Sequence, residues 1–174
     1  MYKINDIVSY QNYGVCRIVD IKSLSIMNQK PRKYYFLHQL YDKCDSTIIK
    51  IPVDTTNIIR PIMTKEEVFK IIEFMKDLEH DWIKDIRHRE VQFKALIDSW
   101  EAENWAKVIK SIYVAKEENR AQDKHKSFPL VDIKYFERAE NFFNQEVAYA
   151  LDIDIKEVPN TILKLIQTKR GCNE

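Results

Sequence analysis

The sequence predicts an α+β protein, with a small β-barrel in residues 1–63 followed by a compact all-α domain in residues 64–174. Before residue 63, β-branched and aromatic residues alternate with polar ones in short runs, a pattern typical of strands. After residue 63, apolar residues recur at helical spacing instead. Hydrophobic residues make up 45% of the chain and charged residues 32%, which is the composition of a folded globular protein rather than a disordered one.

The first two expected strands, residues 7–10 and 15–21, flank Gly14, and the second continues toward Leu24 and Ile26. The chain contains only two glycines. Gly14 therefore indicates a corner that needs a positive φ angle or a close approach of the backbone.

Three further strands are expected at residues 33–40, 47–53 and 57–62, with turns at 28–31 and 42–46. Five short strands at this spacing predict a small barrel. The edges of such a barrel are places where a strand of another protein can add.

The pattern changes period at Thr64. Thr64 and Glu67 have the spacing of a capping box, and apolar residues then follow at helical spacing from Val68 to Leu78. We therefore place the junction between the two domains at about residue 63.

Four more helices complete the predicted chain. They are expected at about 82–96, at about 101–119, from an N-cap at Asp132 to Leu151, and in a short C-terminal segment with Pro159 near its start. A polar stretch at 122–129 separates the middle two. Trp100 and Trp105 are expected in the helical core.

The cellular setting is expected to be the cytoplasm. Cys16, Cys44 and Cys172 are odd in number and far apart, as expected of reduced thiols rather than of a disulfide framework. No apolar run approaches the roughly 20 residues of a membrane helix. Asp6 precedes any apolar segment, which argues against a signal peptide.

The sequence gives little support to an enzyme, and we expect no cofactor. It has no glycine-rich phosphate loop. His80, Asp81, Asp85 and His88 make a weak metal constellation, because charged helix faces are usually just solvated. Cys16 lies in a strand, where a buried core residue is favoured over a nucleophile.

A binding function is better supported than an enzymatic one. The uneven distribution of charge indicates where a nucleic-acid contact could lie. Residues 1–63 hold nine Lys/Arg against five Asp and no Glu, whereas the rest of the chain holds 19 Lys/Arg against 22 Asp/Glu. A nucleic-acid contact of the helical part must therefore come from a local basic face.

Two such faces are candidates. Trp82 precedes Lys84, Arg87, Arg89 and Lys94, so that its ring is expected either to wedge into a base step with the cations on phosphates or to pack inside the protein. The pattern alone favours packing, because tryptophans are mostly buried anchors. The second face, diluted by acidic residues, consists of Lys107, Lys110, Lys116, Arg120, Lys124 and Lys126.

Several motifs together resemble the CarD/CdnL family, whose N-terminal module is shared with transcription-repair coupling factors. In the strand region the motifs are Asn5-Asp6-Ile7-Val8-x-Tyr10-x-x-x-Gly14-Val15-Cys16-x-Ile18, Tyr34-Tyr35-x-Leu37, Ile49-Lys50-Ile51-Pro52-Val53-Asp54 and Arg60-Pro61-Ile62. In the helical region they are Arg89-Glu90, Trp105-Ala106-Lys107-Val108-Ile109-Lys110-Ser111-Ile112-Tyr113, Ala139-Glu140 and Glu146-Val147-Ala148.

The resemblance implies a bacterial transcription regulator: a Tudor-like, SH3-like barrel that binds the RNA polymerase β subunit, and a helical domain that contacts promoter DNA. In the family a tryptophan wedges into the minor groove at the upstream edge of the melted bubble, and Trp82 matches it best. The residues implied for DNA are Trp82, Lys84, Arg87, Arg89, Lys110 and Lys116. Those implied for polymerase are Ile49, Lys50, Ile51 and Pro52.

Two positions depart from the family pattern. Leu24 occupies a place where family members can carry a second arginine, and the basic pair after Trp82 is displaced to Arg87 and Arg89. The resulting expectation is a monomeric regulator that stabilises the open promoter complex. The alternative is a protein–protein adaptor on polymerase without a DNA role.

Overall fold

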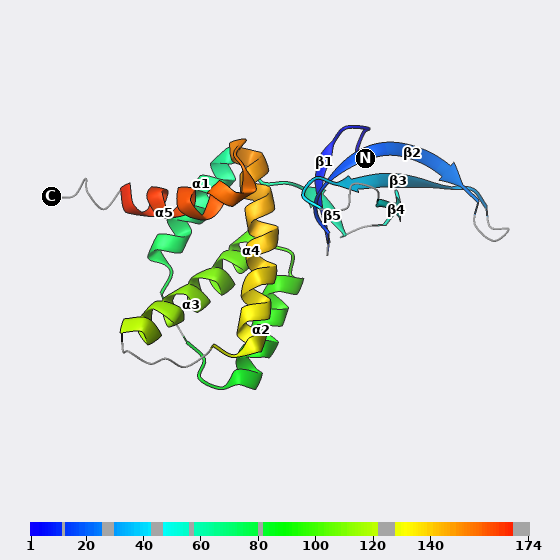
Figure 1. Cartoon of the computed structure of the whole chain (residues 1–174). Coiled ribbons are helices and arrows are strands. Elements are labelled where there is room, and N and C mark those ends of the chain that lie inside the picture. Colours follow the sequence, from blue (N-terminus) through cyan, green and yellow to red (C-terminus); the bar gives the residue numbers. More distant parts are fainter. Residues whose placement is uncertain are drawn as a thin grey trace. The chain divides into compact units, whose positions relative to one another are not determined.

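The computed structural model of the chain describes residues 1–11, 13–25, 30–42, 47–55, 58–79, 82–121 and 128–168. It divides into two compact units, Met1–Met63 and Thr64–Glu174, which are labelled by their strands and helices in Figure 1. The division falls at the residue where the sequence changes from strand to helix periodicity. Each unit has its own core and is described by itself.

The N-terminal unit is a five-stranded antiparallel sheet in the order β4-β3-β2-β1-β5. Its strands are β1 (Ile7–Tyr10), β2 (Gly14–Leu24), β3 (Arg32–Gln39), β4 (Ile48–Pro52) and β5 (Ile59–Pro61). Gly14 lies opposite Tyr10 with φ 77°, which confirms the predicted corner. The register of β2 against β3 shifts between Ile18 and Asp20.

The sheet is open, and this corrects the predicted closed barrel. Among the described residues, β4 pairs with β3 alone and β5 pairs with β1 alone. The two edge strands are short, and each ends in a proline, Pro52 or Pro61. Because proline has no backbone N–H, each of these strands ends at a residue that cannot donate to a further strand pairing.

One face of the sheet holds the core of the N-terminal unit. Its buried members are Val8, Cys16, Ile18, Tyr35, Leu37 and Ile51. This confirms Cys16 as a core residue, and burial raises the pKa of its thiol to about 12. The reactive thiolate is therefore scarce at neutral pH.

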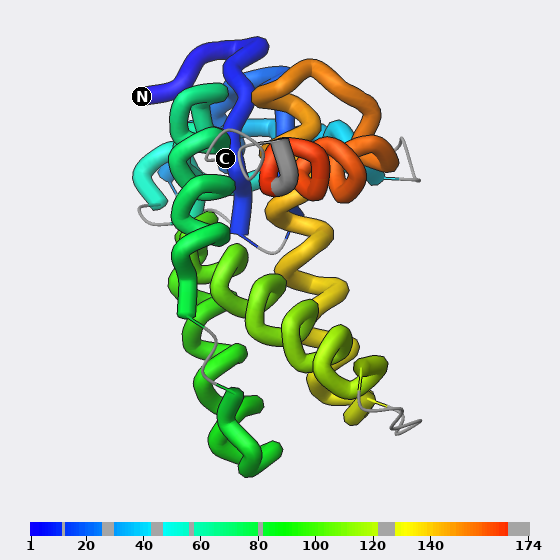
Figure 2. The backbone as a smooth tube through the Cα atoms, turned by 90° about the vertical axis from the view of Figure 1, so that its left-hand side faces the viewer, coloured from blue at the N-terminus to red at the C-terminus, as the bar shows by residue number. Residues whose placement is uncertain are grey.

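Helices make up all the regular secondary structure that is described in the C-terminal unit. Its elements are α1 (Lys65–Asp77), α2 (Ile86–Asp98), α3 (Ala102–Ala121), α4 (Leu130–Leu151), the 3₁₀ turn η1 (Ile155–Glu157) and α5 (Val158–Thr168). Helix α3 packs against α4, and α2 packs against both. Helix α5 contacts α1 and α4 at the other end of the unit (Figures 1 and 2).

The start of α1 confirms the predicted capping box. The Glu67 backbone N–H donates to the Thr64 hydroxyl at 3.2 Å, and the Thr64 N–H donates to the Glu67 carboxylate at 2.7 Å. Two of the backbone donors that a helix start leaves unpaired are thereby satisfied.

The starts of α2 and α4 differ from the prediction. Helix α2 begins at Ile86 because Asp85 is its N-cap, so Trp82 lies in the segment before the helix and not in its first turn. Helix α4 begins at Leu130 with Pro129 at the N-cap position. Asp132 is therefore a residue of the first turn and not the cap.

The predicted tryptophan core is confirmed. Trp105 is fully buried and Trp100 is 8% exposed, and their rings meet edge to face at 5.0 Å. The indole N–H of Trp105 donates to the Ile97 carbonyl at 3.3 Å. Phe142 contacts both rings, so this cluster joins α2, α3 and α4.

Some predicted features lie outside the described residues. These are residues 28–29, 43–46 and 122–127 of the predicted turns, which include Cys44, Lys124 and Lys126, together with His80, Asp81 and Cys172. Over the part of the chain that the structure describes, no helix combines the length and apolar character needed to cross a membrane.

Candidate functional site

Trp82 lies in the segment that joins α1 to α2, and its side chain is half-buried. Its ring centroid is 5.7 Å from that of Phe128, with the ring planes at 59°. Phe128 directly precedes Pro129, the N-cap of α4. The indole belongs to the segment before α2, and it contacts Phe128 just before α4.

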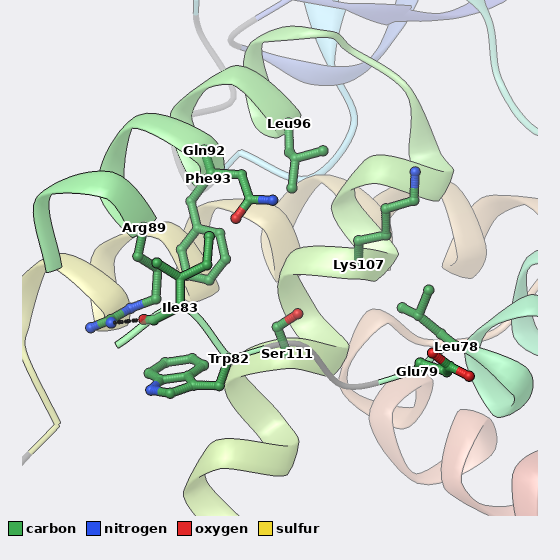
Figure 3. Close-up of a pocket in the computed structure, with 10 residues that line it drawn as sticks. All are labelled: Leu78, Glu79, Trp82, Ile83, Arg89, Gln92, Phe93, Leu96, Lys107 and Ser111. Atoms are coloured by element: carbon green, nitrogen blue, oxygen red, sulfur yellow. Dashed lines mark hydrogen bonds between the residues drawn. The ribbon is translucent and has the colours of Figure 1, made fainter. Parts of the chain in front are cut away.

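Arg89 of α2 provides the second contact of this ring. Its guanidinium carbon is 4.2 Å from the centroid of the Trp82 ring, which is a close cation–π distance. Figure 3 shows the two side chains near each other, with a dashed line from the Arg89 guanidinium to the Ile83 carbonyl. Arg89 is only 2% exposed, which is unusual for an arginine.

Asp132 explains how an arginine can be buried there. The Arg89 Nε donates to Asp132 Oδ1 at 2.8 Å, and Nη2 donates to Oδ2 at 2.5 Å. Asp132 is fully buried as well. The pair is therefore a bidentate, charge-assisted ion pair that links α2 to the first turn of α4.

The third guanidinium nitrogen donates hydrogen bonds to the backbone of the segment that follows Trp82. Arg89 Nη1 donates to the carbonyl of Ile83 at 2.5 Å and, more weakly, to that of Lys84 at 3.4 Å. Arg89 thus holds the carbonyls beside Trp82 while its own plane is fixed by Asp132.

A cavity of about 290 Å³ adjoins this arrangement. It lies between the end of α1, α2 and α3, and Figure 3 labels the side chains around it. Trp82 and Phe93 supply aromatic surface, while Gln92, Lys107 and Ser111 supply polar groups.

The structure brings some of the expected DNA residues together and separates others. Lys84 and Arg87 are exposed near Trp82 in sequence, whereas the guanidinium of Arg89 faces inward to Asp132. Lys116 lies 5.9 Å from the Phe128 ring and 4.1 Å from the Phe136 ring. A continuous series of contacts therefore runs from Arg89 to Lys116, with the Trp82 and Phe128 rings between the two cations.

Lys110 is half-buried on α3 and shares that helix with Lys116.

The roles of Phe128 and Asp132 were not predicted from the sequence. Phe128 preceded a proline in a polar stretch, and Asp132 had the pattern of an N-cap. Only the tertiary contact of Asp132 with Arg89, 43 residues away, identifies it.

The expected polymerase-binding residues lie along the edge strand β4. Lys50 is exposed and lies opposite Phe36, while Ile51 is 4% exposed and faces the core. Ile49 packs against the core cluster, and Pro52 ends the strand opposite Tyr34. The four residues thus alternate between the two faces of the sheet.

The face that carries Lys50 is basic and aromatic. The ammonium groups of Lys50 and Lys22 lie 5.5 and 5.8 Å from the Phe36 ring centroid. Lys22 also pairs with Asp20, and its hydrogen bond lowers the pKa of that carboxyl. Phe36 was not singled out in the sequence, although its strand is rich in aromatic residues.

Leu24, the departure from the family pattern, is half-buried at the end of β2 and pairs with Arg32 of β3. Arg32 donates from Nε to both Asp54 oxygens at 2.8 and 3.0 Å. This hydrogen bond lowers the pKa of Asp54. A guanidinium is therefore present beside Leu24, but on the neighbouring strand.

Comparison with known families identifies the N-terminal unit. Residues 2–63 match the family model of the CarD-like/TRCF RID domain, which confirms the resemblance for this unit. The class defined by that match is one of transcription-related proteins whose RID domain interacts with RNA polymerase. No curated protein matches the chain.

The metal hypothesis receives no new support. Within the described ranges, no three His, Cys, Asp or Glu side chains lie together as metal ligands would. Two of the four residues of the predicted constellation lie outside those ranges, so it stays a prediction.

Proposed function

We propose that this protein is a non-enzymatic, monomeric transcription regulator of the bacterial cytoplasm. Its N-terminal unit docks on the RNA polymerase β subunit, and its helical unit contacts promoter DNA at the upstream edge of the bubble. The observation that carries the proposal is the match of residues 2–63 to the CarD-like/TRCF RID domain.

The edge strand β4 is the docking element of this proposal. Its second backbone edge has no strand partner among the described residues, so a strand of the β subunit can extend the sheet there. Ile48, which is 43% exposed, and Lys50 then meet the partner strand's side chains. The charge of Lys50 favours an acidic residue opposite it.

Trp82 is the DNA-contacting element. Part of the Trp82 indole packs against the protein, and the rest is open to solvent. A side chain that wedges into a base step of DNA needs both, because it must be held in place and yet reach the bases. The exposed cations Lys84 and Arg87 then serve as phosphate contacts, with Lys110 and Lys116 on α3 as a second group. Arg89 is not in this phosphate-binding set, because Asp132 already holds its guanidinium.

Weak DNA contacts suffice in this mechanism. Docking on polymerase holds the helical unit near the promoter at a high effective concentration, so affinity for free DNA is not needed. The formal net charge of +1 for the whole chain agrees with recruitment by polymerase rather than by DNA.

The test measures the lifetime of open promoter complexes formed by purified polymerase with the full-length protein. Trp82→Ala should shorten that lifetime while binding to the β subunit stays unchanged. Tyr113→Ala removes another aromatic ring of the helical unit, 45% exposed on α3, and should leave the lifetime unchanged.

The alternative function predicts a different result. If folded Trp82→Ala binds polymerase normally and leaves the open-complex lifetime unchanged, the protein is an adaptor on polymerase without a DNA role. Loss of polymerase binding on deletion of the N-terminal unit is expected under both functions.

A further inference from the structure

We infer that Arg89 and Asp132 are positioning residues for Trp82: the ion pair fixes the guanidinium, and the fixed guanidinium sets the orientation of the indole. This inference rests on the proposed function of Trp82 as the DNA wedge. It assigns a role to two residues that are buried in the helical unit.

The first step is the rigidity of the guanidinium. Arg89 uses Nε and Nη2 on the two oxygens of Asp132, and Nη1 on the Ile83 carbonyl, so each of its nitrogens is engaged in the plane. A guanidinium whose three nitrogens all donate hydrogen bonds cannot rotate without breaking several of those hydrogen bonds. The faces of the guanidinium stay available for stacking, and its carbon atom lies over the Trp82 ring, 4.2 Å from the ring centroid.

The second step is the need of the Trp82 segment for such support. The residues from Trp82 to Lys84 precede the N-cap Asp85 and belong to no helix or strand. The Ile83 and Lys84 carbonyls accept hydrogen bonds from Arg89 instead. The same side chain therefore orders the backbone next to Trp82 and supports its ring.

The third step is the link to two helices. Arg89 belongs to α2, Asp132 to the first turn of α4, and Phe128 to the residues just before α4. The orientation of the indole is thus tied to the packing of α2 against α4. An indole held in place loses less conformational freedom when it enters a base step, which strengthens the wedge.

A buried ion pair can also serve stability alone, so the test must observe the indole itself. The full-length protein is labelled with 5-fluorotryptophan, and the ¹⁹F signal of Trp82 is assigned by its loss in Trp82→Phe. Arg89→Lys keeps the charge but removes the planar fork. We expect the Trp82 signal to move toward that of free fluorotryptophan, while the Trp100 and Trp105 signals stay in place.

The functional readout is again the open-complex lifetime. Arg89→Lys should shorten it by roughly 2- to 30-fold, the range expected from loss of one cation–π contact. In a Trp82→Ala background the same substitution should have no further effect, because Arg89 acts through the ring. Arg87→Lys is the matched control for the fluorine measurement alone, since Arg87 is exposed on the same helix; it should leave the Trp82 signal unchanged.

If Arg89→Lys does not fold, Asp132→Asn replaces it, because it keeps the shape of the partner and removes its charge. The inference is overturned if the Trp82 signal stays in place in a folded variant of either residue. It is also overturned if the signal moves and the lifetime does not, in a system where Trp82→Ala shortens the lifetime.

Failure of the proposed function gives a separate result. In that case Trp82→Ala itself leaves the lifetime unchanged, which removes the DNA role of the ring and with it the functional half of the inference. The fluorine signal then still decides whether Arg89 orients the indole.

Discussion

The ammonium nitrogen of Lys50 on β4 lies 5.5 Å from the centroid of the Phe36 ring on β3. The contact holds a positive charge beside the open edge of the sheet. We predict that Lys50→Glu weakens binding of the full-length protein to the polymerase β subunit by about 5- to 30-fold, equivalent to about 1–2 kcal/mol. Titration calorimetry with the purified β subunit measures this change.

Lys3→Glu is the control for this charge reversal. Lys3 is exposed in the same unit but lies outside the strands, so its reversal changes the net charge equally without altering β4. Equal weakening by both variants would indicate a general electrostatic effect, and unchanged affinity of Lys50→Glu would remove Lys50 from the interface.

The corner between β1 and β2 supports a second prediction. Gly14 has φ 77°, a conformation in which a Cβ atom is unfavourable. Gly14→Ala should therefore lower the free energy of unfolding by about 1 kcal/mol or more. Urea unfolding followed by circular dichroism measures it. Ser23→Ala, at an exposed position of β2, should change stability much less; a tolerated Gly14→Ala would mean that the corner relaxes.

Local patterns explain why much of this fold could be predicted from the sequence. Gly14, the β-branched runs and the Thr64–Glu67 spacing each act within a few residues, and the structure contains the corner, the strands and the cap that they predict. The prediction of a closed barrel was wrong, because closure depends on whether the two edge strands pair with each other. Neither Pro52 nor Pro61 can donate a backbone hydrogen bond to such a pairing.

The candidate site was harder to predict, because its contacts join distant residues. The helix expected from about residue 82 begins at Ile86, because Asp85 is its N-cap. Asp132 likewise resembles an N-cap, since an acidic residue is favourable both at the cap and in the first turn. Its pairing with Arg89 depends on how α2 packs against α4, which no local pattern contains.

The capping box of α1 gives a third prediction. Thr64→Ala removes the hydroxyl that accepts from the Glu67 N–H, so the free energy of unfolding should fall by about 1 kcal/mol. Thermal unfolding of the full-length protein provides the measurement. Thr64→Ser keeps the acceptor and should retain most of the stability. If Thr64→Ser loses as much as Thr64→Ala, the effect comes from the methyl group instead of the cap.

The buried part of α4 gives a prediction about pH. Glu140 is half-buried, and desolvation raises the pKa of its carboxyl, although the nearby Lys116 opposes the shift. The folded protein therefore binds this proton more tightly than the unfolded chain, and ionisation of Glu140 costs stability as pH rises through the folded-state pKa. Glu140→Gln should raise the unfolding temperature at pH 7, but not at pH 3.5, where the carboxyl is protonated in both states. Calorimetry at the two pH values tests this, with the exposed Glu90→Gln as control. A gain of equal size at both pH values would show that side-chain packing, not ionisation, is responsible.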